Sequence, residues 1–336
     1  MKKAEKDATF SAHLAEACSY HSRMLSDGPR NRGLRATIEK YVNENTSFLD
    51  VGSGTGIWAI LAAKLGAKRV VAIEIEECFI PIIFKHAQEN GVADRIEIIH
   101  GNVDDVKLRG KFDVIVSEIF GRNVYGEATT RSFINVRERF LAPGGVIIPQ
   151  WMKMYIAPLL RSNNNHSVPT DLPLTTDYLN SLRLNYGRLT SFEDSAGLEF
   201  AGEPKLLTGV DYRTIEKPLS SGPWSAEWDL EDVSKVDSFL IFSISQFAPG
   251  IELNALESKT WALERYDFDP FEIGKGTIRF SYLVDPKNAS WTISLPSNPE
   301  VHPQTYSPIF AFTRTRMAEA TTPYSKTRRS KSRASK

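Results

Sequence analysis

Between residues 47 and 149, short apolar runs alternate with longer stretches that have helical periodicity. The apolar runs cover residues 47–51, 69–74 and 112–116. Short continuous runs bounded by polar residues are typical of buried parallel strands. Gly66 and Gly91 stand where two of the intervening helices would end. The pattern predicts a doubly wound α/β sheet, in which a turn at residues 141–145 leads into a last strand at 146–148.

The pattern differs on either side of this region. Residues 12 to 42 carry apolar positions at helical spacing, and Pro29 is predicted to separate two helices. Beyond Trp151 the helical rhythm fades, and short alternating segments appear at residues 153–158, 237–244 and 276–284. Such segments predict antiparallel strands. Pro149 therefore marks a boundary between two kinds of structure.

A glycine-rich turn follows the first predicted strand. The sequence Asp50-Val-Gly52-Ser-Gly54-Thr-Gly56 leads directly into an apolar helical stretch. Glycine allows positive φ and close approach of a ligand, and the start of the next helix offers unpaired N–H groups. Glu74 ends the following strand about twenty residues later, a position suited to accept hydrogen bonds from ribose hydroxyls. A nucleoside cofactor is expected.

The spacing of these glycines argues against a dinucleotide. Gly52-x-Gly54-x-Gly56 differs from the G-x-G-x-x-G spacing of dinucleotide binders. Asp50 would repel a pyrophosphate, whereas it can accept a hydrogen bond from the ammonium group of an amino-acid moiety. S-adenosyl-L-methionine combines a nucleoside with such a moiety and is the expected cofactor.

Two glutamates follow the apolar run at 112–116. Glu118 and Glu127 are nine residues apart, and Glu118 should emerge at the carboxyl end of its strand, where open α/β sheets bind ligands. Two carboxylates that face one cleft could hold a cation between them. For the pair alone, a solvated loop kept soluble by its acids is the alternative interpretation.

Taken together, these segments resemble the protein arginine methyltransferases, a family of class I S-adenosylmethionine enzymes. Residues 48–56 and 71–74 resemble the cofactor motifs of the family, and Ser117-Glu118 through Glu127 resembles its double-glutamate loop. Residues 21–31 resemble the amino-terminal helix that closes over the cofactor.

The resemblance implies a set of site residues. Arg30 would bind the methionine carboxylate, His21 would contact the cofactor, and Met24 matches a position that controls the product. Residues 98–105 resemble the segment that places a backbone N–H and an acid against the adenine, here Val103 and Asp104. The implied cofactor-binding residues are His21, Met24, Arg30, Asp50, Gly52, Gly54, Glu74, Val103 and Asp104.

The implied catalytic residues are Glu118, Glu127 and His302. A guanidinium is a poor nucleophile, so two carboxylates would localise its charge and aim one nitrogen at the methyl group. His302 resembles the histidine of a threonine-histidine-tryptophan loop, but Val301 and Pro303 replace its neighbours. The paired aromatic residues that the family carries ahead of the amino-terminal helix are also missing, so the usual peptide substrate is in doubt.

The resemblance also implies an organisation: a Rossmann-like sheet followed by an antiparallel β-barrel with a helical dimerisation arm. The expected parts are amino-terminal helices at 1–45, a cofactor domain at 46–149, a barrel domain at 150–318 with an arm at about 160–205, and a basic disordered tail at 319–336. The arm implies a head-to-tail homodimer.

Composition adds little to this interpretation. The net formal charge is zero, yet residues 325–336 hold six cations and no acid. The tail is most simply solvated, with nucleic acid or an acidic partner as alternatives. No apolar run approaches the length of a membrane span, and Cys18 and Cys78 are too few for a disulfide framework or a zinc site. We expect no metal, no membrane contact and a cytoplasmic location.

The residues therefore favour methyl transfer to an arginine guanidinium. The substrate is an arginine-containing peptide or protein, or free L-arginine in a biosynthetic pathway. Two alternatives remain open: a class I methyltransferase for another small-molecule nucleophile, and a catalytically silent dimeric scaffold of the same fold.

Overall fold

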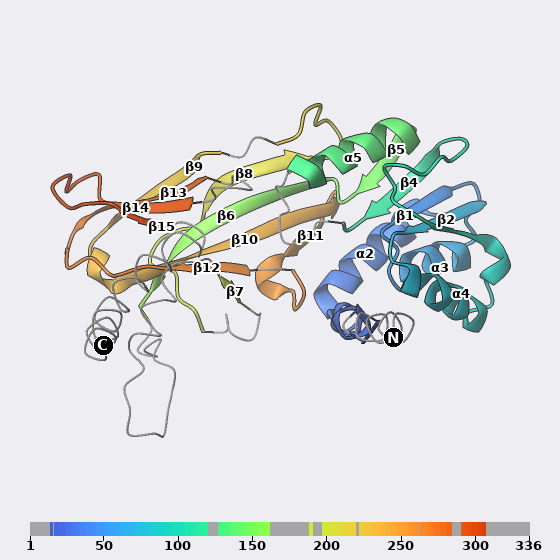
Figure 1. Cartoon of the computed structure of the whole chain (residues 1–336), viewed down its shortest axis with the longest axis horizontal. Coiled ribbons are helices and arrows are strands. Elements are labelled where there is room, and N and C mark those ends of the chain that lie inside the picture. Colours follow the sequence, from blue (N-terminus) through green and yellow to red (C-terminus); the bar gives the residue numbers. More distant parts are fainter. Residues whose placement is uncertain are drawn as a thin grey trace, which may run out of the picture.

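The computed structural model describes residues 14–15, 17–119, 127–161, 188–190, 197–219, 222–261, 263–283 and 290–306, and for 127–128, 188–190 and 306 it describes the secondary structure alone. The molecule is elongated, with a parallel sheet at one end and antiparallel sheets at the other (Figure 1). Within these residues, no helix is both long enough and apolar enough to cross a bilayer.

The predicted parallel sheet is confirmed. Its five strands have the order β3-β2-β1-β4-β5. They are β1 (Ser47–Val51), β2 (Arg69–Glu74), β3 (Ile96–His100), β4 (Phe112–Ser117) and β5 (Leu141–Ile148). Val51 lies opposite both Ile73 and Ser117. The carboxyl ends of three neighbouring strands therefore meet at one edge of the sheet, where Asp50, Glu74 and Glu118 lie.

Helices cover both faces of this sheet. One face packs against α2 (Gly28–Tyr41), α3 (Ile57–Lys64) and α4 (Ile80–Glu89). The other face packs against α5 (Glu127–Phe140), through Phe133, Val136 and Phe140. Short 3-10 turns, η1 (Glu77–Phe79) and η2 (Ala93–Arg95), flank α4. The result is the three-layer arrangement expected when both faces of a parallel sheet are buried.

The turn predicted at residues 141–145 is wrong. Strand β5 begins at Leu141, directly after α5 ends at Phe140. The register of β4 and β5 shifts between Phe112 and Val114, and Gly144 has φ of +75°. The glycine-rich segment is therefore accommodated as an irregularity inside the strand, because glycine adopts positive φ without strain.

The predicted antiparallel region forms two sheets. The larger has the order β7-β12-β10-β6-β8, with β11 paired to β10, and the smaller has the order β15-β14-β13-β9. The strands are β6 (Trp151–Leu160), β7 (Arg188–Thr190), β8 (Lys205–Asp211), β9 (Trp224–Leu230), β10 (Val236–Ala248), β11 (Ile251–Asn254), β12 (Leu263–Asp267), β13 (Gly276–Leu283), β14 (Ser290–Ser294) and β15 (Gln304–Tyr306). Turns η3 (Val233–Lys235) and η4 (Ala255–Glu257) flank β10 and β11.

A core rich in aromatic residues fills the space between these two sheets. Phe239 of β10 contacts Trp228 of β9 and Phe280 of β13, with ring centroids 5.5 and 5.1 Å apart. The strands that the alternating pattern predicted are thus confirmed. Most of the predicted arm at 160–205 and all of the tail at 319–336 lie outside the described residues.

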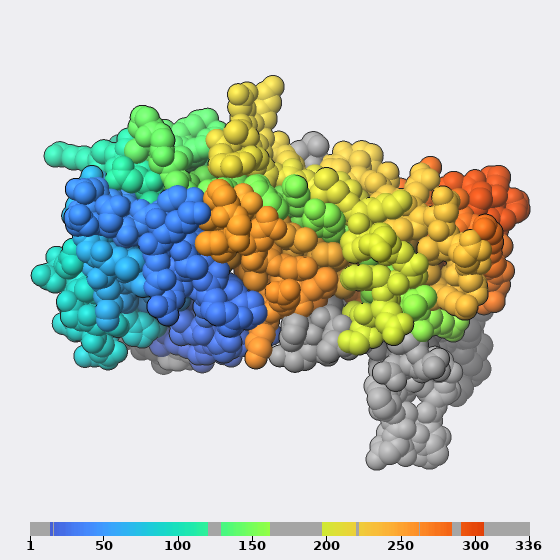
Figure 2. Space-filling view, turned by 180° about the vertical axis from the view of Figure 1, so that it is seen from behind, coloured from blue at the N-terminus to red at the C-terminus, as the bar shows by residue number. Residues whose placement is uncertain are grey.

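The two regions share a core at their junction. Phe247 of β10 and Leu253 of β11 belong to the same apolar cluster as Leu34 and Ile38 of α2, and Trp261 packs against that cluster. A Cβ built on Gly33 of α2 would lie 3.0 Å from the ring of Phe247. Figure 2 shows the blue amino-terminal segments lying against the orange segments that follow β10. Helix α2 is therefore held by both the parallel sheet and the antiparallel region.

Candidate functional site

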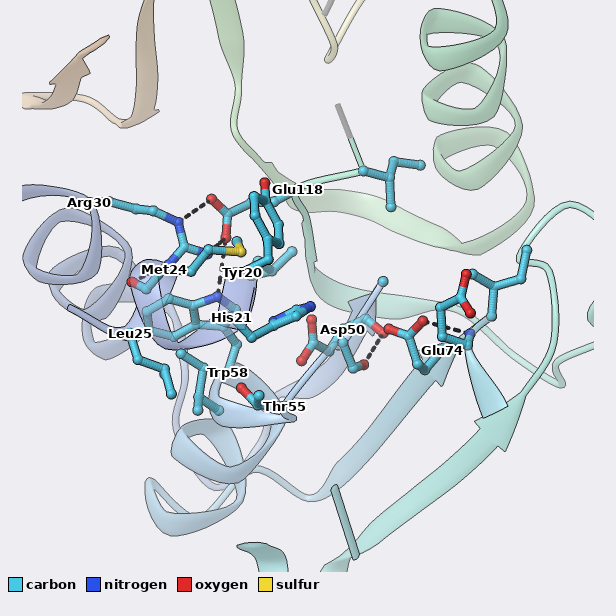
Figure 3. A pocket seen from close by; sticks show the side chains of 17 residues that line it. Tyr20, His21, Met24, Leu25, Arg30, Asp50, Thr55, Trp58, Glu74 and Glu118 are labelled. Carbon is cyan, nitrogen blue, oxygen red and sulfur yellow. Dashed lines mark hydrogen bonds and ion pairs between the residues drawn. The ribbon is translucent and has the colours of Figure 1, made fainter. Parts of the chain in front are cut away.

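A cavity of about 460 Å³ lies at the carboxyl edge of the parallel sheet, beneath the amino-terminal helix (Figure 3). Its walls come from the ends of β1, β2 and β4, the glycine-rich turn, the helical residues 17–25, and the starts of α2 and α3. The lining residues are Tyr20, His21, Met24, Leu25, Arg30, Asp50, Gly52, Ser53, Thr55, Ile57, Trp58, Glu74, Ile75, Glu76, Val116, Glu118 and Ile119.

The glycine-rich turn brings the backbone close to the cavity. Gly52 and Gly54 have φ of +72° and +53°, a region that residues with side chains rarely adopt. A Cβ on Gly52 would lie 2.7 Å from the side chain of Ile119, and a Cβ on Gly54 would lie 2.2 Å from His21 Cε1. A side chain at either position would therefore clash with Ile119 or with His21, so glycine allows the turn to pack closely against these two residues.

Two carboxylates stabilise this turn. Glu74 accepts hydrogen bonds from the backbone N–H of Gly54 at 2.7 Å and of Glu76 at 2.9 Å. Asp50 accepts one from the backbone N–H of Ala59, in the first turn of α3, at 3.1 Å. Asp50 is 2% exposed, and this burial raises the pKa of its carboxyl group to about 7.

The strongest interaction at the cavity joins Arg30 of α2 to Glu118 at the end of β4. Arg30 Nε donates to Glu118 Oε1 at 2.8 Å, and Arg30 Nη2 donates to Glu118 Oε2, so the ion pair is bidentate. Trp58 Nε1 donates to the same Oε2 at 3.3 Å. The side chains of Arg30 and Glu118 are only 3% and 9% exposed. Glu118 therefore accepts three hydrogen bonds, two of them from a guanidinium, at the place where it was predicted to hold a cation.

Helical residues 17–25 close the cavity from above. The His21 ring lies 4.4 Å from that of Phe79 and 5.7 Å from that of Tyr20. Burial lowers the pKa of His21, and the nearby guanidinium of Arg30 lowers it further. Asn31 Nδ2 donates to the carbonyls of Met24 and Leu25 at the end of this segment. The segment is therefore attached to α2 as well as to the turn beneath it.

Arg30 is placed by the start of α2. Asp27 precedes the helix as its N-cap, and its Oδ1 accepts from the backbone N–H of Arg30 at 3.3 Å. The other oxygen of Asp27 accepts from Ser258 Oγ at 2.6 Å and from both the backbone N–H and Oγ1 of Thr260. The fully buried Asp27 therefore connects the start of α2, which carries Arg30, to the loop after η4.

Acids outnumber cations around the cavity. Its described lining includes Asp50, Glu74, Glu76 and Glu118, and Arg30 is the one lysine or arginine among these lining residues. Such a surface favours a ligand that carries positive charge. No group of described residues has the composition of a metal site.

Three predicted site residues, Val103, Asp104 and His302, are not among the residues that line the cavity. Val103 is buried in the core beneath α5, and Asp104 accepts from Ser132 and Asn135 of that helix. His302 is exposed in the segment before β15, a strand of the smaller antiparallel sheet. The backbone of Glu127 begins α5, while its side chain lies outside the described residues. The structure brings together His21, Met24, Arg30, Asp50, Gly52, Gly54, Glu74 and Glu118, with Gly54 beneath His21.

Two features of the site were missed in the sequence. Trp58 donates to Glu118, and its position two residues after Gly56 could have indicated a polar ring N–H at the start of the helix. The contact between Asp27 and Thr260 joins residues 233 positions apart, and no local pattern marks it.

Comparisons with known proteins point in one direction. Residues 34–149 match the family model described as ribosomal protein L11 methyltransferase. A probable protein arginine N-methyltransferase 6 of Arabidopsis thaliana is 30% identical over 205 residues, which cover 58% of this chain and 46% of that protein. The protein arginine N-methyltransferase PRMT10 of Oryza sativa subsp. japonica is 42% identical over 147 residues, covering 42% of this chain and 37% of that protein. The chain thus spans half or less of the length of these curated relatives.

Solved structures extend the likeness to the antiparallel region. The structure of Arabidopsis thaliana protein arginine methyltransferase 10 matches with a TM-score of 0.69 and 21% identity, covering 87% of this chain and 98% of that one. The Trypanosoma brucei PRMT1 enzyme-prozyme complex with AdoHcy matches with a TM-score of 0.69 and 19% identity, covering 85% of this chain and 97% of that one. At these identities the matches establish the shared fold.

Proposed function

We propose that this chain, a relative of the protein arginine N-methyltransferases in sequence and in fold, transfers a methyl group from S-adenosyl-L-methionine to an arginine guanidinium. The observation that carries the proposal is the Arg30–Glu118 pair, because it shows a guanidinium already bound bidentately by the carboxylate predicted to hold the substrate. The names of the relatives support the same reaction.

The cavity fits the proposed cofactor. Glu74 keeps lone pairs that could accept from ribose hydroxyls, since the two backbone N–H groups that donate to it each use a different oxygen. Gly52 lines the cavity with a positive φ, so its backbone faces the ligand space without a side chain. Arg30 would bind the carboxylate of the methionine moiety, and Asp50, at the same edge, would face its ammonium group. When bound, the cofactor supplies a methyl group on a positively charged sulfur.

The role of the protein is to position and polarise the acceptor. A guanidinium delocalises its lone pairs over three nitrogens, so localising positive charge on two of them leaves the third more nucleophilic. We propose that Glu118 performs this task and that Glu127, at the start of α5, supplies the second carboxylate. Positioning of this kind is worth several orders of magnitude in rate. We propose that one of these carboxylates accepts the proton that leaves the guanidinium after methyl transfer, because His302 is not among the residues that line the cavity.

The substrate is proposed to be arginine within a protein or peptide, as the names of the relatives suggest. Free L-arginine is the second candidate, favoured by the missing aromatic pair ahead of the amino-terminal helix. Mass spectrometry of the protein incubated with S-adenosylmethionine and either an arginine-rich peptide pool or free L-arginine separates the two. Methylation of neither would contradict the proposed function.

Replacing Glu118 with glutamine should reduce methyl transfer at least a hundredfold, because the charge that localises the guanidinium is lost while the shape is kept. The dissociation constant for S-adenosylhomocysteine should not rise, since Arg30 is still present to bind its carboxylate. Glu39→Gln is the matched control, as Glu39 is an exposed residue of α2 that forms an ion pair with Arg35. Unchanged turnover in Glu118→Gln would exclude this carboxylate from the reaction.

A further inference from the structure

We propose that Arg30 occupies the substrate position on Glu118 until the cofactor carboxylate draws it away, so that cofactor binding creates the guanidinium site. This inference rests on the proposed function. It assigns Arg30 a second role, as an internal competitor of the substrate, beyond its expected contact with the cofactor.

The hydrogen bonds of Arg30 show why the two guanidiniums compete. Arg30 presents its Nε and Nη2 edge to both oxygens of Glu118, the same edge that a substrate arginine would present. Trp58 donates to Oε2 as well. Because Glu118 is 9% exposed and held on this side by three donors, a second bidentate guanidinium has no equivalent place to bind.

The remaining contacts of Arg30 show what would change its position. Its Nη1 donates to Asn31 Oδ1 at 2.7 Å and to the carbonyl of Met24 at 3.3 Å, both neutral acceptors. Among the described residues, Glu118 is therefore the only carboxylate that Arg30 contacts. A ligand carboxylate in the cavity offers a second anion, and charge-assisted bonds to it can replace those to Glu118.

Charge makes the exchange favourable as a whole. The Arg30–Glu118 pair is buried and its charges cancel, so a substrate cation entering beside it would find this carboxylate already paired. With a carboxylate beside Arg30, Glu118 is left to pair with the substrate. The cofactor and the guanidinium substrate should thus increase each other's affinity, because coupling between two sites is reciprocal.

The test is isothermal titration calorimetry of the full chain with N-acetyl-arginine amide as the guanidinium probe. The probe is titrated alone, with saturating S-adenosylhomocysteine, and with saturating methylthioadenosine, which has the nucleoside and sulfur but neither carboxylate nor amine. S-adenosylhomocysteine should tighten probe binding by between about 5- and 150-fold, the range of typical coupling. Methylthioadenosine should leave it within twofold.

The outcomes separate this proposal from the proposed function. Probe binding that is measurable but equal with and without S-adenosylhomocysteine overturns the coupling while leaving the guanidinium site intact. Equal tightening by methylthioadenosine also overturns it, because the carboxylate would then be irrelevant. Absence of probe binding in every arm contradicts the guanidinium site itself, and the coupling with it.

Variants give a second line of evidence. Arg30→Gln removes the internal guanidinium, so the probe should bind without cofactor as tightly as it binds the wild type with S-adenosylhomocysteine, and the coupling should vanish. Arg35→Gln is the matched control, because Arg35 lies on the same helix but is exposed and paired with Glu39. The control should keep the full coupling; a coupling that survives in Arg30→Gln would refute the role of Arg30.

Discussion

At the scale of single residues, burial of charge dominates the site. Asp50 lies near the end of β1 and is 2% exposed, and its carboxyl group accepts a hydrogen bond from one backbone N–H of α3. Nearby Glu118 and Glu74 add to the effect of burial and raise the pKa of Asp50 to about 7. An acid held in this way is protonated more readily in the folded protein than in the unfolded chain, so stability must depend on pH.

The sign of that dependence is the reverse of the usual one for an acid. Between about pH 4 and pH 7 the folded state binds more protons at Asp50 than the unfolded state, so stability falls as pH rises through this window. Within this window, each pH unit should lower the free energy of unfolding of the wild type, relative to that of Asp50→Asn, by up to about 1.4 kcal/mol. Above about pH 7 the difference between the two proteins should stay constant. Urea unfolding at pH 4.5, 5.5, 6.5 and 7.5 measures this; parallel curves for the two proteins would contradict the assignment.

Residue patterns predicted part of the site. Asp50, Gly52, Gly54, Glu74 and Glu118 were found because chemistry and strand ends coincide along the chain. The bond between Trp58 and Glu118 could not be predicted in the same way, since it depends on how α3 is rotated against β4. The place of Asp104 was predicted from resemblance alone, and in the structure its carboxylate binds α5.

At the scale of elements, the contact between residues 17–25 and the glycine-rich turn closes the cavity. The His21 ring lies directly over Gly54 and beside Phe79. Neither the turn nor the helix alone would form a closed site. The fit between them depends on the absence of a side chain at residue 54.

Gly54→Ala should therefore open this contact. The new Cβ would lie 2.2 Å from His21, so the ring and its helix must move. Affinity for S-adenosylhomocysteine should fall at least tenfold, and the free energy of unfolding should fall by about 1–2 kcal/mol because φ is positive. Gly66→Ala is the matched control, with φ of +93° and open space around it.

Calorimetry measures the binding, and limited proteolysis reports whether residues 17–25 are released. The control should show a similar loss of stability without the loss of affinity. If both variants bound S-adenosylhomocysteine equally well, the segment would not be the lid of this cavity.

Secondary structure was predicted well where periodicity was clear. The strands predicted at 47–51 and 69–74 match β1 and β2 from end to end, because polar residues flank each apolar run and mark where the strand begins and ends. The segment at 141–145 was misread because proline and glycine usually mark turns, whereas here β5 absorbs them as an irregularity. The pairing of the antiparallel strands could not be predicted, as it depends on contacts far apart in the chain.

At the scale of the whole molecule, Asp27 joins the two regions. It caps α2, positions Arg30, and accepts three hydrogen bonds from Ser258 and Thr260. The antiparallel region is therefore part of the support of the cavity.

Asp27→Ala should destabilise the protein by about 3 kcal/mol, because a helix cap and several bonds to a buried carboxylate are lost together. Asp232→Ala is the matched control, because Asp232 caps η3 by accepting from the backbone N–H of Ser234, a contact within the antiparallel region. Its loss should be about 1 kcal/mol. Chemical denaturation measures both, and equal losses would show that the contact with residues 258–260 contributes nothing.

The shared core around α2 has a consequence for synthesis of the chain. A ribosome makes the parallel sheet first, yet Phe247, Leu253 and Trp261, which cover α2, are translated about a hundred residues after β5 ends. Domains generally fold as units, the amino-terminal one first, as they emerge. During synthesis, one side of α2 therefore stays exposed after the parallel sheet has formed. The contacts that support the cavity are completed only when the strands of the antiparallel region have left the ribosome.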